Sequence, residues 1–540
     1  MHAVEGWRGT LRRWGFPLAA LLCGVVAVAL RAPRCALASE PAGSDWPQYL
    51  AGAHALLARG TDPSLAGAWP DWRHALYPML LGLLSRTAEA VSAARALAWS
   101  GVLGMLVGAY LLARALGGRL AGGLAVALVA SAATMPVALG WMNPYPLLSG
   151  LMAGSLGAAV GSSRSPDLRW PLLSGLLAGA AWAVDPRGAI AIGAAGLAVL
   201  LAAARSTRPW MPGAVFVVGV LAGPLVDRIA APRTHVGMDA EHLARVPLDR
   251  QEDEQRARTA EELAARGPSE VAAACTPMDA PGCALALVRH NVGQRREDGD
   301  LPPGFVAWVA LLALLPRRRV SPRGGHVARR VVGWRASALA FTTLGLPLAA
   351  AVWGASRVLF PDRYLLPFLP MLAVAIAVGA MRAWDLAAAR AQVLAHAGVA
   401  WVGAAALLLA TVLAMPRGRV REGASHNGAA VWAWVRASRA SGDSVMDCAG
   451  LGLDARALPE RLHGGRINPA GVDGHACLAW VRRPWDVGDA EAWVLTSAAG
   501  PLPSPGADWS LAQVFAAEVQ PEEPAVSLWR RRPEAWPAAR

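Results

Sequence analysis

Ionisable side chains gather in a segment near the N-terminus that separates two apolar stretches. Asp45 stands just before an apolar segment that ends at Gly60. Arg73, His74 and Tyr77 follow, immediately before or within the next apolar stretch. An aspartate can accept a proton and an arginine can bind an anion through a forked pair of hydrogen bonds. The same aspartate also suits the N-cap of a following helix, so both uses stay open.

Long apolar runs dominate the rest of the chain. Of the 540 residues, 55% are hydrophobic and 16% charged, and the mean hydropathy is +0.35. This composition excludes an ordinary soluble enzyme and predicts a polytopic α-helical membrane protein. We expect about eleven spans, at 15–30, 92–113, 119–138, 146–160, 171–184, 188–204, 211–228, 304–316, 336–354, 364–381 and 396–415.

The arginines indicate which side of the membrane each connecting segment faces. Arg8, Arg12 and Arg13 precede the first span, and further arginines crowd into 317–335. Under the positive-inside rule, these segments are cytoplasmic and the N-terminus lies inside. We expect the first span to be an uncleaved anchor, although Ala36-Leu37-Ala38 resembles a signal-peptide cleavage site.

An odd number of spans then places three pieces outside the cytoplasm. They are the loops 31–91 and 229–303 and the tail 416–540, so the chain divides into a membrane domain, 1–415, and a small outer α/β domain, 416–540. The net charge of +13 is spread between apolar runs, which favours lipid headgroups over nucleic acid as the counter-charge. The expected location is a bacterial-type inner membrane.

Two cysteine pairs fall within these outer pieces. Cys275 and Cys283 lie in the second loop, and Cys448 and Cys477 lie in the tail. Disulfides form in oxidising compartments, so the outer placement predicts one disulfide in each segment. Isolated buried thiols are the alternative. The spacing of the six cysteines matches no metal site.

Several segments in order resemble one enzyme superfamily. The Asp45 loop is followed by Leu76-Tyr77-Pro78, a span opens with 94–97 (ARAL), and a later turn reads WAVDPR at 182–187. The segment 361–370 (PDRYLLPFLP) leads into a late span. These features resemble the GT-C glycosyltransferases, particularly the protein O-mannosyltransferases and lipid A aminoarabinose transferases.

The resemblance implies an inverting transfer from a polyprenyl-phosphate-linked sugar to an envelope glycan, lipid or protein acceptor. It assigns the catalytic base to Asp45 and substrate binding to Arg73, His74, Tyr77, Arg187, Arg363 and Tyr364. Arg187 and Arg363 are the expected phosphate ligands, and snorkelling of a span-end arginine is the alternative for both.

The chain also departs from the superfamily pattern. Asn143 stands where relatives often carry a second aspartate, and an asparagine cannot act as a base. No metal ligands are therefore assigned, and the need for a divalent cation stays open. Two other functions are compatible with the sequence, a secondary transporter and a non-catalytic envelope-assembly protein. A transporter would be expected to have two repeated halves with ionisable groups near mid-membrane.

Overall fold

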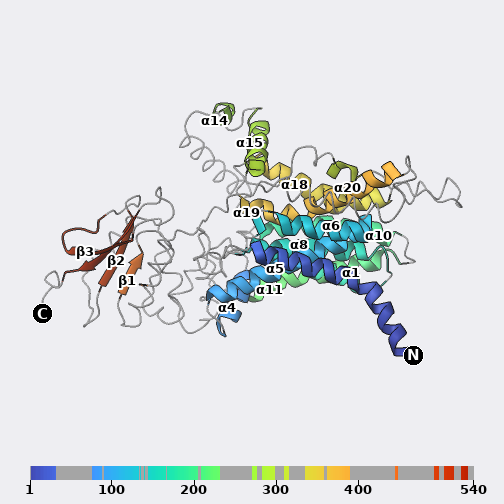
Figure 1. Ribbon diagram of the computed structural model, residues 1–540, viewed down its shortest axis with the longest axis horizontal. Coiled ribbons are helices and arrows are strands. Elements are labelled where there is room, and N and C mark those ends of the chain that lie inside the picture. Colours follow the sequence, from blue (N-terminus) through green and yellow to red (C-terminus); the bar gives the residue numbers. More distant parts are fainter. Residues whose placement is uncertain are drawn as a thin grey trace.

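A computed structural model gives the fold of the chain as a helical bundle and a small sheet (Figure 1). It describes residues 2–31, 76–87, 90–132, 134–135, 139, 144–165, 167–204, 208–230, 270–275, 282–297, 309–314, 335–357, 362–388, 434, 444–447, 492–497, 504–515 and 525–532. The predicted boundary at 415/416 lies outside these residues.

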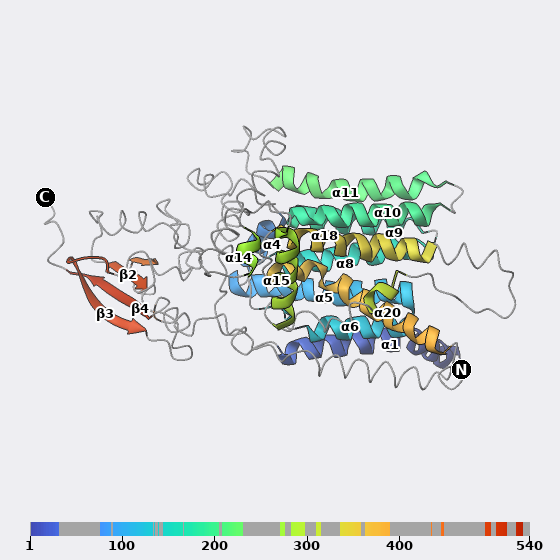
Figure 2. The same ribbon diagram turned by 90° about the horizontal axis from the view of Figure 1, so that it is seen from above.

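The bundle consists of apolar helices that run side by side along a common axis (Figures 1 and 2). Its first half contains α1 (His2–Arg31), α4 (Leu76–Ser85), α5 (Ala90–Gly117), α6 (Arg119–Ser131), α8 (Tyr145–Gly161) and α9 (Arg169–Val184). Its second half contains η2 (Pro186–Gly188), α10 (Ala189–Ala203), α11 (Trp210–Ala230), η4 (Phe341–Gly345), α18 (Leu346–Ala355), α19 (Asp362–Leu365), η5 (Leu366–Phe368) and α20 (Leu369–Ala388).

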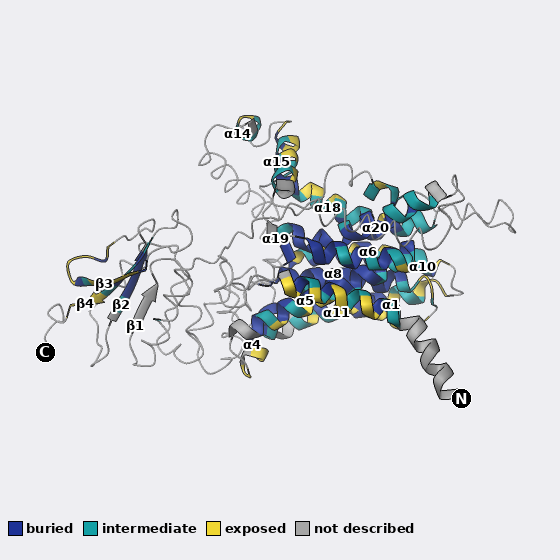
Figure 3. Cartoon of the chain, viewed as in Figure 1, coloured by how far each residue is buried: buried dark blue, intermediate teal, exposed yellow. Residues whose placement is uncertain are grey.

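Among the described residues, four helical stretches are long and apolar enough to cross a bilayer. They are Ala93–Gly117, Pro186–Ala203, Arg335–Ala355 and Leu366–Asp385, and shorter apolar helices lie between them. Large apolar side chains remain exposed on the outside of the bundle, for example Leu22, Leu200, Val218 and Leu221, while the middle is buried (Figure 3). An apolar exterior around a buried core is what a lipid environment requires, and the protein is a multi-pass membrane protein.

One predicted span extends too far. The apolar run 119–138 was expected to cross as a single helix, but α6 ends at Ser131 and Ala132 adopts an extended conformation. Pro136 explains the difference, because it has no N–H to donate to the carbonyl of residue 132. The predicted span 304–316 is described only at 309–314, and 396–415 lies outside the described residues.

Glycines let two pairs of helices approach until their backbones touch. On α9 and α11, a Cβ at Gly175 would overlap the Phe216 carbonyl, and one at Gly179 would overlap the Val220 carbonyl. On α5 and α8, a Cβ at Gly101 would overlap the backbone of Pro146. Small residues four apart are the usual means of close packing between membrane helices. In lipid the hydrophobic effect does not drive helices together, so their association depends on close van der Waals contact.

The C-terminal region forms a four-stranded mixed sheet, which is the β part of the predicted α/β domain. Its strands are β1 (Ser444–Asp447), β2 (Ala492–Ser497), β3 (Trp509–Phe515) and β4 (Val526–Arg531), in the order β1-β2-β4-β3. β1 is parallel to β2, and the other two pairs are antiparallel. The Trp529 indole donates to the Thr496 hydroxyl at 2.8 Å, which joins β4 to β2.

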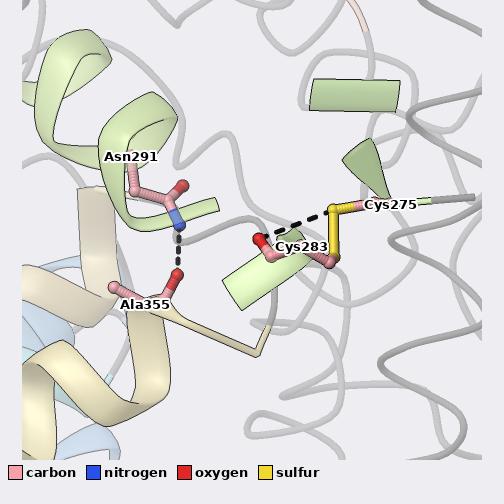
Figure 4. The surroundings of a disulfide bond; sticks show 4 residues. All are labelled: Cys275, Cys283, Asn291 and Ala355. Carbon is pink, nitrogen blue, oxygen red and sulfur yellow. Dashed lines mark hydrogen bonds between the residues drawn. A yellow bond between two sulfur atoms is a disulfide. The ribbon is translucent and has the colours of Figure 1, made fainter. Parts of the chain in front are cut away.

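A disulfide-linked hairpin contacts the C-terminal end of α18 (Figure 4). Cys275 follows α14 (Glu270–Ala274) and is bonded to Cys283, the first residue of α15 (Cys283–Glu297). This confirms the first predicted cysteine pair. Cys448 and Cys477 lie outside the described residues, so the second pair stays a prediction.

Close packing of α9 on α11 predicts different outcomes for two glycine substitutions. Gly179→Ala should lower bundle stability by about 1–3 kcal/mol, because its Cβ meets the Val220 backbone. Gly193→Ala on α10 should be neutral or stabilising by up to about 1 kcal/mol, because its Cβ meets nothing within 4 Å. Thermal unfolding of the purified protein in detergent measures both. Equal effects of the two substitutions would contradict the packing argument.

Candidate functional site

The turn between α9 and α10 presents an arginine at one end of the bundle. Asp185 leaves the helical conformation, with φ −159° and ψ 142°, and its Oδ1 accepts the backbone N–H of Arg187 at 2.9 Å. Asp185 thereby caps η2, and Pro186 at the first position fits because its missing N–H needs no partner there. A Cβ at Gly188 would overlap the backbone of Ala181 and Trp182, so glycine allows the tight return of the chain.

The guanidinium of Arg187 packs against two tyrosine rings that adjoin each other. Its Cζ is 4.0 Å from the ring centroid of Tyr364 and 5.2 Å from that of Tyr145. The two rings contact each other edge to face, with centroids 5.8 Å apart and an interplanar angle of 69°. Both cation–ring distances fall within the range of an attractive cation–π interaction. The two rings therefore help to hold the guanidinium in place.

Asp185 supplies the only negative charge that the described residues bring to this arginine. Its Oδ2 lies 3.5 Å from Arg187 Nη1, longer than the 2.7–2.9 Å typical of a strong charge-assisted hydrogen bond. The Arg187 side chain keeps 28% of its surface exposed, against 11% for Asp185. The aspartate thus balances the charge of the guanidinium while leaving one side of it accessible.

The tyrosines come from two other parts of the chain. Tyr145 is the first residue of α8 and is buried, and Pro146 follows it in the first turn. Tyr364 lies in the short helix α19, which continues through η5 into α20. Three segments that are distant in sequence therefore meet at Arg187. We call Tyr145, Asp185, Arg187 and Tyr364 the Arg187 cluster.

The structure brings two of the predicted site residues, Arg187 and Tyr364, into contact. Tyr77 is buried in α4. Arg363 precedes Tyr364 in α19, but its side chain is outside the described part of the chain. Asp45, Arg73 and His74 are also outside it, and their roles stay predictions.

Sequence reasoning missed Tyr145 and Asp185 as members of the site. The chain has only 5 tyrosines, and this rarity was a usable signal in the sequence. Two of the five pack on Arg187. Asp185 was visible in the same DPR turn as Arg187.

The cluster has the chemistry of an anion site rather than a metal site. An arginine carries five N–H donors in a planar fork that matches phosphate or carboxylate geometry. Within the described residues, no group of three or more His, Cys, Asp or Glu side chains is placed to hold a metal ion. The arrangement can bind an anionic headgroup at the depth where a span ends.

Comparisons with known proteins find structural similarity only. No protein-family model matches the sequence, and no curated protein matches it. The oligosaccharyltransferase of Archaeoglobus fulgidus, tethered to an acceptor peptide with an NVT sequon, is 11% identical with a TM-score of 0.48. That match covers 91% of this chain and 70% of the archaeal one.

Two further solved structures are similar. The A. fulgidus oligosaccharyltransferase AglB, in complex with an inhibitory peptide and a dolichol-phosphate, is 12% identical at a TM-score of 0.43, covering 79% of this chain and 58% of that one. ArnT from Cupriavidus metallidurans, in the apo state, is 14% identical at a TM-score of 0.39, covering 96% of this chain and 98% of that one. All these neighbours are GT-C glycosyltransferases, the superfamily that the sequence resembles.

Proposed function

We propose that this chain is a membrane glycosyltransferase that takes its sugar from a polyprenyl-phosphate donor and transfers it on the extracytoplasmic face. The observation that carries the proposal is the Arg187 cluster, in which a partly exposed guanidinium packs against two tyrosine rings at a span end. In this role Arg187 binds the phosphate of the lipid donor, which is the leaving group of the transfer.

The position of the cluster suits a lipid phosphate. Arg187 lies at the start of the apolar stretch Pro186–Ala203, so its head is at the depth of the lipid headgroups when the stretch crosses the bilayer. A prenyl chain attached to the phosphate would then lie along the apolar exterior of the bundle. Because the rings already orient the guanidinium, little side-chain entropy is lost when phosphate binds.

The disulfide supports the extracytoplasmic placement. The hairpin that it closes contacts the C-terminal end of α18, and α19 with Tyr364 follows shortly in the chain. Disulfides persist in oxidising compartments. At the other end of the bundle, the Arg164 guanidinium donates to the Arg114 carbonyl at 3.2 Å, beside Arg119. Arginines there agree with a cytoplasmic side under the positive-inside rule.

The chemical step itself rests on the sequence resemblance. Asp45 would accept the proton of the acceptor hydroxyl as the anomeric carbon is attacked, which gives inversion in a single displacement. Arg73, His74 and Arg363 would add contacts to donor or acceptor. Figure 1 shows α4, which follows this loop in the chain, at the same end of the bundle as α19.

Phosphate binding tests the proposal directly. Arg187→Ala should weaken binding of decaprenyl phosphate to the purified protein in nanodiscs by roughly tenfold to a hundredfold, the loss expected for one charge-assisted hydrogen bond. Arg187→Lys should give an intermediate loss, because an ammonium keeps the charge but lacks the planar fork. Asp45→Asn should leave binding unchanged and lower sugar transfer by about 10²-fold or more.

Arg357→Ala is the matched control for phosphate binding. Arg357, just beyond the end of α18, also packs on an aromatic ring, that of Trp353 at 5.3 Å. Decaprenol, which lacks the phosphate, controls for the prenyl chain. Wild-type affinity in Arg187→Ala would refute the phosphate role. Phosphate binding without transfer to any of a panel of acceptors would favour an assembly protein or a transporter.

The proposed orientation makes a separate prediction about the tail. Alkaline phosphatase fused after residue 540 should be active in intact cells, because residues 416–540 are expected outside the cytoplasm. The same reporter fused after Gly117, at the arginine-rich end of α5, should be inactive. An active fusion at Gly117 with an inactive one at the C-terminus would reverse the orientation and move the Arg187 cluster to the cytoplasmic face.

A further inference from the structure

The segment that carries Tyr364 is tied to the rest of the protein on both sides by buried side chains. Before it, Asn291 on α15 donates from Nδ2 to the carbonyl of Ala355 at 2.8 Å. After it, Ser149 on α8 donates from Oγ to the carbonyl of Leu366 at 2.8 Å. We propose that Asn291 and Ser149 are positioning residues of the Arg187 cluster, and that they hold Tyr364 over the guanidinium.

The Ser149 bond meets a need that the sequence creates. In a regular helix, the Leu366 carbonyl would accept the N–H of residue 370, but residue 370 is a proline. The chain turns instead into η5, where Leu369 N–H bonds to Leu366. The Ser149 hydroxyl adds a second donor from α8, which is how serine compensates for proline within membrane helices. Tyr364 lies two residues before this anchored carbonyl.

Ser149 also belongs to the same helix face as the cluster. It follows Tyr145 by one turn on α8, and Tyr364 precedes Leu366 by two residues, so the contact pairs Tyr145–Tyr364 and Ser149–Leu366 run in parallel. The hydrogen bond therefore sets the register of α8 against α19 and η5. A slip of this register would change the 5.8 Å ring contact and the 4.0 Å approach of Tyr364 to Arg187.

The Asn291 bond connects the cluster to the disulfide hairpin. Ala355 is the last residue of α18, where carbonyls lack partners within the helix, and Asn291 is 98% buried against it. One turn earlier on α15, Leu287 packs with Cys275 and Cys283. The disulfide thus fixes the hairpin, the hairpin orients Asn291, and Asn291 holds the end of α18 that leads to Tyr364 (Figure 4).

Hydrogen exchange tests the anchoring without any ligand. Ser149→Ala and Asn291→Leu should each raise amide exchange in peptides covering 362–369 by roughly tenfold, the amount expected for one lost hydrogen bond. Ser163→Ala is the matched control, because its hydroxyl makes a local 2.7 Å bond to Val160 just past the far end of α8. Exchange at 362–369 that is unchanged in both variants would overturn the proposal.

Binding of decaprenyl phosphate then tests whether the anchoring serves the cluster; this step rests on the proposed function. Each variant should weaken binding by roughly three- to tenfold, and Ser163→Ala should not. In a Tyr364→Leu background the effect of Ser149→Ala should disappear, since it acts through that ring. A general loss of packing would instead weaken binding equally in both backgrounds, and this result would overturn the positioning role.

The failures of the two proposals can be told apart. If wild-type protein binds decaprenyl phosphate through Arg187 while Ser149→Ala and Asn291→Leu bind it equally well, the positioning role is wrong and the proposed function stands. If wild-type protein does not bind the probe, the phosphate role fails. The exchange experiment still decides whether Asn291 and Ser149 hold the Tyr364 segment.

Discussion

A guanidinium at the end of a membrane span has to be held in place without losing its capacity to bind an anion. Full pairing with a carboxylate would neutralise it, and a bare charge at this depth would be costly. The Arg187 cluster meets both demands, because two tyrosine rings supply attraction from the sides and Asp185 stays at 3.5 Å while it caps the turn. The arginine keeps an accessible side for a ligand.

This arrangement depends on helices packed closely enough to bring three segments to one point. Glycines on α5 and α8 set the position of Tyr145, and glycines on α9 and α11 set the turn that carries Arg187. Each backbone contact leaves little freedom for one helix to slide on the other. The orientation of the guanidinium is thus a consequence of small residues that lie well inside the bundle.

The sequence predicted the parts of this site that depend on local pattern. Apolar runs located the helices, the DPR turn indicated Arg187, and two cysteines eight residues apart formed the predicted disulfide. Contacts between distant segments escaped prediction: Tyr145 meets Tyr364, and Ser149 bonds to a carbonyl 217 residues away. Periodicity indicates which face of a helix is apolar, but it does not indicate which other helix packs on that face. The predicted span 119–138 also extended beyond Ser131, because a search for apolar residues takes no account of the helix-breaking effect of Pro136.

The hairpin shows why so small an element needs a covalent bond. α14 has five residues and α15 has fifteen, and the core that they share among the described residues consists of Cys275, Cys283 and Leu287 with two partly buried neighbours. So small a core cannot offset the entropy of ordering the hairpin. The disulfide removes much of that entropy from the unfolded chain, so that the hairpin is already ordered when Asn291 reaches the Ala355 carbonyl. Because such a bond persists where thiols are oxidised, the proposed extracytoplasmic placement also accounts for the stability of the hairpin.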